Sequence, residues 1–327
     1  MRVLEVMSLR TITKNTFFVI SISLAATLLS SCSIFSFGGS ERPQIDNSTS
    51  PFGTPEVVAH LLSGDIDESS GLAVSKCQQD VFWTHNDSGG GPFLYAFDSS
   101  GKSLGTWRLN GARNTDWEDM ATVKAADGQC YLYIGEIGDN QQRRDSHLAY
   151  RVREPQVTMD GSGSSKKAPL SIEEFNVLKF QYPDGRHNAE ALLVDPVTND
   201  IYVITKEIGG PSEVFKLIPK FDVDEAQTAI KVGSVSLPAV PTGFVTGGDI
   251  SPDGSHVVLC DYFSGYELVL PSTAKTFDEV WTQTPTPFDL GPREIGESIA
   301  FAADANTVFA TTENAKPPLV RVLRKQK

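Results

Sequence analysis

Apolar and polar positions along the chain form a repeating two-part pattern. In its clearest copy, Glu190 opens the apolar run 191–194, a turn of the form Asp-Pro-x-x-Asn-Asp follows, and a β-branched and aromatic run at 201–205 ends in Lys206 and Glu207. Turn-forming residues between two β-prone runs predict a β-hairpin. The same layout occurs in four more places: 70–87, 118–136, 249–261 and 297–313. Copies at intervals of roughly 50 to 70 residues are typical of a repeat architecture, and this one is all-β.

The strands within each copy indicate how the repeats assemble. Further β-prone runs complete four strands in the first four copies, with the last strand of the fourth copy expected at 280–288 and a polar loop at 160–167 in the second. The fifth copy reaches only a third strand, at 319–323, and a lone apolar run at 57–62 can supply the missing one. We therefore expect an all-β β-propeller of five four-stranded blades, with the ring closed by the N-terminal strand joining the last blade. Six blades is the alternative, if the long second copy contains another.

The first residues have the layout of a secretory signal. Arg2, Arg10 and Lys14 precede an apolar run at 17–29 that is short for a membrane span. The run ends in Leu-Ser-Ser-Cys32, which resembles the bacterial lipobox, in which the cysteine is lipidated and becomes the first mature residue. The alternative is an ordinary signal peptide followed by a chance cysteine.

Three segments follow from these features. Residues 1–31 are expected to be a lipoprotein signal peptide, 32–54 a flexible tether rich in small and polar residues, and 55–327 the propeller domain. A lipid on Cys32 predicts a membrane-anchored protein of the bacterial cell envelope, on the periplasmic face of the outer membrane or on the cell surface. In bacterial lipoproteins, an Asp directly after the lipidated cysteine signals retention in the inner membrane. Here that residue is Ser33, which does not favour retention there.

The net charge of the chain indicates which kinds of molecule it can bind. Removing residues 1–31, which hold three basic and one acidic side chain, leaves 25 basic and 40 acidic side chains and a net charge of −15. Such a surface repels nucleic acid and suits a cation, and we expect no nucleic-acid partner. We expect a monomer that binds an unidentified small ligand or an envelope protein.

The three remaining cysteines have different settings. Cys77 and Cys130 fall in equivalent turns of successive copies, so that a disulfide is one interpretation and two unrelated buried thiols the other. Cys260 lies within an apolar strand and is expected to be a small core residue.

Carboxylates stand at the heads of the innermost strands. In a propeller the start of the first strand and the end of the second open on the same face, at one mouth of the central channel. The strand heads are Ser70, Glu118, Glu190, Glu297 and one residue at 246 to 249. Three glutamates facing one narrow channel repel each other unless they are protonated or bound to a cation.

Other polar residues are expected at the same mouth. They follow second strands or precede first strands: His85, Asn86, Asp87, Arg113, Asp116, Asp139, Asn140, Arg186, His187, Lys206 and Arg293. Loops on a rigid scaffold are where ligands bind, although Asp and Asn next to strands are often only turn formers. For His85 a structural hydrogen bond is the alternative to catalysis.

The pattern over residues 68–314 resembles the calcium-activated apyrases, the soluble calcium-activated nucleotidases, and the SdiA-regulated and phytase-like propellers of bacterial envelopes. The resemblance implies one Ca²⁺ in the channel, held by a Ser, Glu, Glu, Ser, Glu series with one residue from each blade. This chain offers Ser70, Glu118, Glu190, Thr246 and Glu297. Asp249 is the alternative in the fourth blade, depending on register.

The resemblance fails where the apyrases hold phosphate. An Arg of the apyrase pattern corresponds to Asp87 here and a Lys corresponds to Asp139, whereas phosphate groups prefer cations. The sequence is therefore consistent with three classes. The first is a calcium-binding envelope lipoprotein whose channel-mouth face binds a ligand through Asn86, Arg113, Asn140, Arg186, His187, Lys206 and Arg293. The second is a calcium-dependent hydrolase of a phosphoester, ester or lactone, with Asp87, Asp116, Asp139 or His85 in catalysis. The third is a purely structural lipoprotein.

Overall fold

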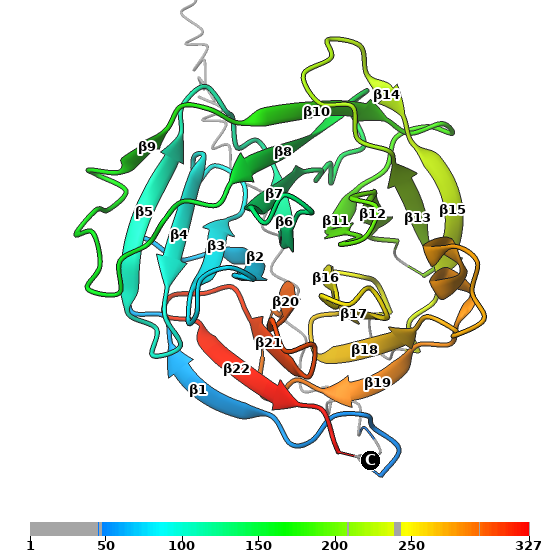
Figure 1. The fold of residues 1–327 in the computed structure, drawn as a ribbon. Helices are drawn as coiled ribbons and strands as arrows, with labels where there is room; N and C mark the ends of the chain where they lie inside the picture. The colour runs from blue at the N-terminus through cyan, green and yellow to red at the C-terminus, as the bar shows by residue number, and fades with distance from the viewer. Residues whose placement is uncertain (1–44, 46–47, 208, 239–242, 294, 327) are drawn as a thin grey trace, which may run out of the picture. The chain divides into compact units, whose positions relative to one another are not determined.

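The structure is a computed structural model that describes residue 45 and residues 48–207, 209–238, 243–293 and 295–326. The expected signal peptide, Cys32 and most of the expected tether lie outside these residues. Five sheets stand in a ring, and one edge strand of each sheet faces the centre of the ring (Figure 1). The protein is a five-bladed β-propeller, which confirms the predicted fold and excludes the six-bladed alternative.

The blades follow one another along the chain. Blade 1 contains β2 (Ser69–Val74), β3 (Phe82–Asn86), β4 (Phe93–Phe97), β5 (Ser103–Leu109) and β9 (Leu170–Ile172). Blade 2 contains β6 (Trp117–Lys124), β7 (Cys130–Glu136), β8 (His147–Arg153), β10 (Asn176–Gln181) and β14 (Gln227–Thr228). Blade 3 contains β11 (Ala189–Val194), β12 (Ile201–Thr205), β13 (Ser212–Leu217) and β15 (Ile230–Val235). Blade 4 contains β16 (Gly247–Ile250), β17 (His256–Cys260), β18 (Ser264–Val269) and β19 (Thr286–Asp289).

The ring closes between the two ends of the chain. Blade 5 contains β20 (Ser298–Phe301), β21 (Thr307–Thr311), β22 (Pro318–Leu323) and, as its outer strand, β1 (Glu56–His60). β1 pairs antiparallel with β22, and Glu56 lies opposite Arg321, to which it is also joined by an ion pair of 2.7 Å. The predicted pairing is confirmed, and it removes the exposed edge that the last blade would otherwise present.

Packing on the domain begins before β1. Phe52 is fully buried, forms an isolated bridge with Arg324 and packs on Phe288, with ring centroids 4.3 Å apart. These contacts lie within the stretch assigned to the tether. Among the described residues, no helix is long and apolar enough to span a membrane.

Two outer features differ from the expected strands. The long insert of the second copy returns to blade 1, where β9 adds to the edge of β5 in parallel. The strand expected at 280–288 is wrong in its first half, because residues Phe277–Thr282 form a 3-10 helix. A capping box between Thr276 and Glu279 starts this turn, and its Trp281 packs on Tyr202 of blade 3 with ring centroids 5.4 Å apart.

The hydrophobic core lies between neighbouring blades. Five clusters of buried residues are present in the described chain, one for each pair of adjacent sheets. Trp83 of blade 1 and Trp117 of blade 2 belong to the same cluster and are fully buried. Because this packing holds each sheet on both faces, the loops at the channel mouth stand on a rigid support.

Candidate metal centre at the channel mouth

Three of the predicted ring residues lie at irregularities in strand pairing. The register shifts between Ser69 and Gly71 in blade 1, between Trp117 and Met120 in blade 2, and between Ala189 and Ala191 in blade 3. The extra residues at these points include Ser70, Glu118 and Glu190. A β-bulge redirects the side chain of its extra residue, so the local backbone itself sets these three residues apart from their strands.

One group of three carboxylates is close enough to share a cation. Asp87, Asp116 and Glu118 each offer a carboxylate oxygen, and these oxygens all lie within 4.8 Å of one another. Asp87 follows β3, Asp116 precedes β6 and Glu118 lies within β6, so blades 1 and 2 both contribute. We call these three residues the acidic triad.

The electrostatics of the acidic triad favour either protons or a cation. Burial, reinforced by the neighbouring carboxylates, raises the pKa of Asp87 to about 7 and that of Asp116 to about 6. Burial, followed by Glu190 and Asp87, also holds the pKa of Glu118 well above its usual range. In addition, Oδ1 of Asp87 is buried without a hydrogen-bond partner among the described residues. Arg144 lowers the pKa of Asp116 in part, but none of the three carboxylates forms an ion pair among the described residues, and burial and like charge prevail.

A glycine leaves the space that this arrangement needs. A Cβ atom on Gly138 would lie 2.0 Å from Oε1 of Glu118 and 2.6 Å from Oδ2 of Asp116. The backbone N–H of Gly138 also donates to the carbonyl of Asp116 over 3.2 Å. Any side chain at this position would therefore displace the carboxylates.

Hydrogen bonds fix the loops that carry the acidic triad. The side-chain amide of Asn114 donates to the carbonyls of Asn86 and Asp87, both over 3.0 Å. The carboxylate of Glu136 accepts from the backbone N–H groups of Thr115 and Asp116, over 2.8 and 3.1 Å. Glu136 also pairs with Arg144 at 2.9 Å. The loops are thus held from both sides.

The other half of the mouth carries its own cation. The ammonium of Lys206 lies 3.0 Å from Oε2 of Glu190 and donates to the hydroxyl of Tyr262 over 3.1 Å. Although burial lowers it, the pKa of Lys206 is held well above its usual range by Glu190 and Glu297. Burial and the neighbouring Glu313 raise the pKa of Glu297 in turn, against the opposing effect of Lys206. Lys206 thus supplies positive charge beside Glu190 and within electrostatic range of Glu297.

The residues predicted to form the calcium ring have different neighbours: Glu190 lies beside Lys206, and Glu118 lies with Asp87 and Asp116. Glu118, Glu190 and Glu297 do lie within electrostatic range of one another. The hydroxyl of Ser70 donates to the carbonyl of Glu118 over 2.6 Å, and that of Thr246 donates to the carbonyl of Gly296 over 2.8 Å.

Asp249, the alternative fourth-blade ligand, has structural partners instead. Its carboxylate accepts from the backbone N–H of Phe301 over 2.9 Å and lies 3.8 Å from the ammonium of Lys76.

Four other predicted site residues are committed to the backbone. The ring of His85 is buried, its Nδ1 lies 3.1 Å from the carbonyl of Asn86, and burial lowers its pKa to about 4. The Asn86 side chain holds the loop at 65–68, and the Asp139 carboxylate accepts from the N–H groups of two following residues. The buried guanidinium of Arg293 donates to the carbonyl of Asp261 over 3.0 Å.

The remaining predicted residues lie nearer the surface. Arg113 and Asn140 are exposed, and the guanidinium of Arg186 pairs with Asp145 at 2.6 Å. His187 lies 2.9 Å from Asp184 on blade 3, apart from the acidic triad.

A cleft of about 540 Å³ lies along blade 2, and one of its lining residues, Thr115, precedes Asp116 of the acidic triad in the sequence. Arg113, Thr115, Glu136 and Arg144 line its polar side, and its apolar side is formed by Leu148, Tyr150, Phe175 and Val177. Thr115 and Glu136 belong to the same hydrogen-bonded loop as Asp116. The sequence marked Arg113 in this cleft as a site residue but not Glu136, because nothing in the spacing shows that the end of β7 would bond to the loop that carries Asp116.

The donors of the acidic triad suit a hard cation. All three are carboxylates, and the flexible shell of Ca²⁺, with six to eight oxygen ligands, leaves room for carbonyls and water. No Cys or His belongs to the group, which disfavours Zn²⁺.

Comparisons with known proteins do not add a function. No protein-family model and no curated protein sequence matches this chain. Among solved structures, the soluble aldose sugar dehydrogenase (Asd) from Escherichia coli in its apo form is 11% identical, with a TM-score of 0.44, and the match covers 83% of this chain and 99% of that one. A chain of a nidogen/laminin complex is 13% identical, with a TM-score of 0.39, and the match covers 75% of this chain and 72% of that one. At these scores the likeness carries no argument, and the five-bladed architecture rests on the sheets described above.

Proposed function

We propose that this protein is a calcium-binding propeller of the bacterial cell envelope, in which an ion held by Asp87, Asp116 and Glu118 organises a ligand-binding face. The observation that carries the proposal is the approach of three carboxylates within 4.8 Å beside a glycine that keeps their space open. A divalent cation would relieve the repulsion that raises their pKa values.

The cleft along blade 2 is the proposed site of the ligand. Arg113 favours an acidic group, whereas Arg144 is already paired with Glu136 in the same lining. The aromatic residues Tyr150 and Phe175 favour a flat apolar or sugar-like surface. A calcium ion held by Asp116 would add positive charge close to Thr115, one of the residues that line this cleft. The ligand class supported best is therefore an oxygen-rich molecule with at least one negative charge.

Thermal unfolding of the purified protein in calcium, in magnesium and in chelator tests the ion. A ligand at a hundredfold excess over its Kd stabilises the folded state by about 2.7 kcal/mol, so calcium should raise the unfolding midpoint clearly. Asp116→Asn should remove this gain.

Asp249→Asn provides a matched control. Asp249 is also a buried channel carboxylate, but it is bonded to Phe301 and Lys76, so this variant should lose stability equally in calcium and in chelator. An equal calcium effect in Asp116→Asn and in the native protein would reject the site.

A calcium-dependent hydrolase is the second candidate, and one observation favours it. Asp87 has a pKa of about 7 and a carboxylate oxygen without a partner, which suits a general base near neutral pH. Turnover of generic phosphoesters and lactones, measured with calcium and with chelator, tests this activity. Turnover that needs calcium and is lost in Asp87→Asn would support it, whereas equal rates in both media would exclude it.

The location rests on the sequence around Cys32. We infer that the chain is anchored by a lipid on this residue. In Cys32→Ser, unprocessed chain should accumulate and membrane association through the lipid should be lost. Membrane association without accumulation of the precursor would contradict the assignment.

A further inference from the structure

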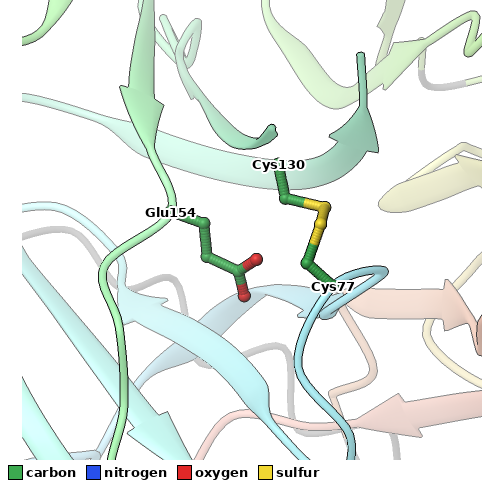
Figure 2. A group of neighbouring side chains, drawn as sticks. All are labelled: Cys77, Cys130 and Glu154. Atoms are coloured by element: carbon green, nitrogen blue, oxygen red, sulfur yellow. A yellow bond between two sulfur atoms is a disulfide. The ribbon is translucent and has the colours of Figure 1, made fainter. Parts of the chain in front are cut away.

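A second group of metal-ligating side chains lies away from the channel mouth, at the junction of blades 1 and 2. Cys77, in the turn between β2 and β3, and Cys130, the first residue of β7, are joined by a disulfide with their Cα atoms 6.1 Å apart. Glu154, directly after β8, completes the group, and one of its carboxylate oxygens lies within 4.8 Å of both sulfur atoms (Figure 2).

The carboxylate of Glu154 has an unfilled bonding position. Its Oε1 accepts from the indole N–H of Trp83 over 2.8 Å, but its Oε2 is buried without a hydrogen-bond partner among the described residues. Glu154 is only 5% exposed. A disulfide has no proton to donate, so the oxidised pair leaves this oxygen without a partner. Two thiols or a metal ion in the same place would satisfy it.

The three residues are held in place by bonds other than the disulfide. The backbone N–H of Glu154 donates to the carbonyl of Cys130 over 2.8 Å. The side chain of Gln78, next to Cys77, donates to the carbonyl of Pro155 over 2.9 Å and accepts from Val157 over 2.8 Å. Breaking the disulfide would therefore leave both sulfur atoms next to the carboxylate.

We propose that Cys77, Cys130 and Glu154 form a redox-gated Zn²⁺ site, which is closed by the disulfide and opened when a dithiol reduces it. In the exchange two electrons pass to the disulfide, its S–S bond breaks, two thiols form and the reductant becomes a disulfide. Binding of Zn²⁺ then forms two Zn–S bonds, one at each sulfur, and releases two protons. Two thiolates, one carboxylate and a water make the tetrahedral shell that Zn²⁺ prefers. Cys77 is exposed, which gives the reductant access.

The test uses the full chain carrying Cys32→Ser and Cys260→Ser, so that the only thiols come from the proposed site. The chain is reduced with a dithiol, separated from the reductant, supplied with excess calcium to fill the acidic triad and titrated with Cd²⁺ and Zn²⁺. We expect a cadmium–thiolate absorption band that saturates at one ion per chain, competition by Zn²⁺ and release of two protons. The oxidised chain should show no band.

The variant Glu154→Gln tests whether the carboxylate binds the metal ion or whether the two thiols bind it without Glu154. The amide oxygen of Gln can still accept from Trp83, so the fold should be kept while Zn²⁺ affinity falls at least tenfold. Glu174→Gln, at an exposed carboxylate, is the matched control and should leave the affinity unchanged. Equal affinity in Glu154→Gln and the parent, no saturating band after reduction, or unfolding of the reduced chain would each overturn the proposal.

Discussion

At the scale of residues, the buried carboxylates of the channel mouth are of two kinds, which differ in whether a cation of the chain neutralises them. Glu190 is neutralised by an ammonium from the chain itself, that of Lys206 at 3.0 Å. Among the described residues Asp87, Asp116 and Glu118 form no ion pair, and burial raises the pKa of each. Like charges brought together out of water need compensation, and the side of the mouth that lacks a lysine is the side where we place the metal ion.

Gly138→Ala should block this site with little change to the backbone. The added Cβ would meet Oε1 of Glu118 at 2.0 Å, and Gly138 is not at a positive φ, so alanine adds bulk but no left-handed strain. We expect calcium affinity, measured by titration calorimetry, to fall at least tenfold. Gly210→Ala, where an added Cβ meets no atom within 4 Å, is the control and should bind calcium normally. Normal binding by Gly138→Ala would contradict the assigned geometry.

The sequence predicted part of this site and could not predict the rest. The strand-head position identified Glu118 and Glu190, because a residue at the start of an inner strand has one place in a propeller. The sequence did not show that Glu190 would pair with a lysine while Glu118 would not, since the approach of Lys206 to Glu190 depends on loops that carry no periodic signal. Gly138 was missed for a similar reason: a glycine after a strand usually indicates a turn, and only the structure shows a carboxylate against its Cα.

At the scale of elements, the β-prone apolar runs and the turn residues between them were sufficient to locate the blades. The inner strands β2 and β11 are buried at every position, as expected of strands that line a filled channel. The 3-10 helix at Phe277–Thr282 was mistaken for strand because its Val280 and Trp281 are apolar and β-prone. Here a local capping box overrode propensity.

Ring closure should contribute strongly to stability. Removing residues 50–62 takes away β1 and the fully buried Phe52, and truncation of a buried phenylalanine alone costs about 3–5 kcal/mol. We expect the denaturant midpoint of the whole domain to fall in a single transition, because the last blade loses its outer strand.

Single substitutions refine the same test. Phe52→Ala should lower the midpoint by a comparable amount, whereas Val197→Ala, at a valine that is 75% exposed, should change it little. An unchanged midpoint after removal of residues 50–62 would mean that the pairing of β1 with β22 is dispensable.

At the scale of the whole molecule, the protein is acidic and gathers several partly or fully buried carboxyl groups at the channel mouth. Its formal net charge is −13 at pH 7. Burial moves several carboxyl groups of the mouth toward their protonated forms. The free energy of unfolding of the metal-free protein therefore depends on proton binding. Stability should therefore depend on pH in a way that calcium changes.

Without calcium, the protein should become less stable as the pH rises from about 4 to about 7. The pKa values of Asp87 and Asp116 are raised from 3.8 to about 7 and about 6, so in this window the folded chain binds more protons than the unfolded chain. His85 and His147, whose pKa values burial lowers from 6.5 to about 4, act in the opposite direction but oppose a larger set of carboxylates.

Unfolding midpoints of the metal-free protein at about pH 5.5 and about pH 7.5 provide the measurement. The midpoint should be higher at the lower pH, and calcium should raise it more at the higher pH, where the carboxylates are ionised. If calcium raised the midpoint equally at both pH values, these carboxylates would not be the ligands of the ion.

Calcium titration of the purified protein by calorimetry tests the central claim most directly. Three carboxylates in one group predict a single site per chain, stronger for Ca²⁺ than for Mg²⁺, and its heat should be lost in Glu118→Gln. A titration without saturable heat, or one that Glu118→Gln leaves unchanged, would show that the acidic triad does not bind calcium.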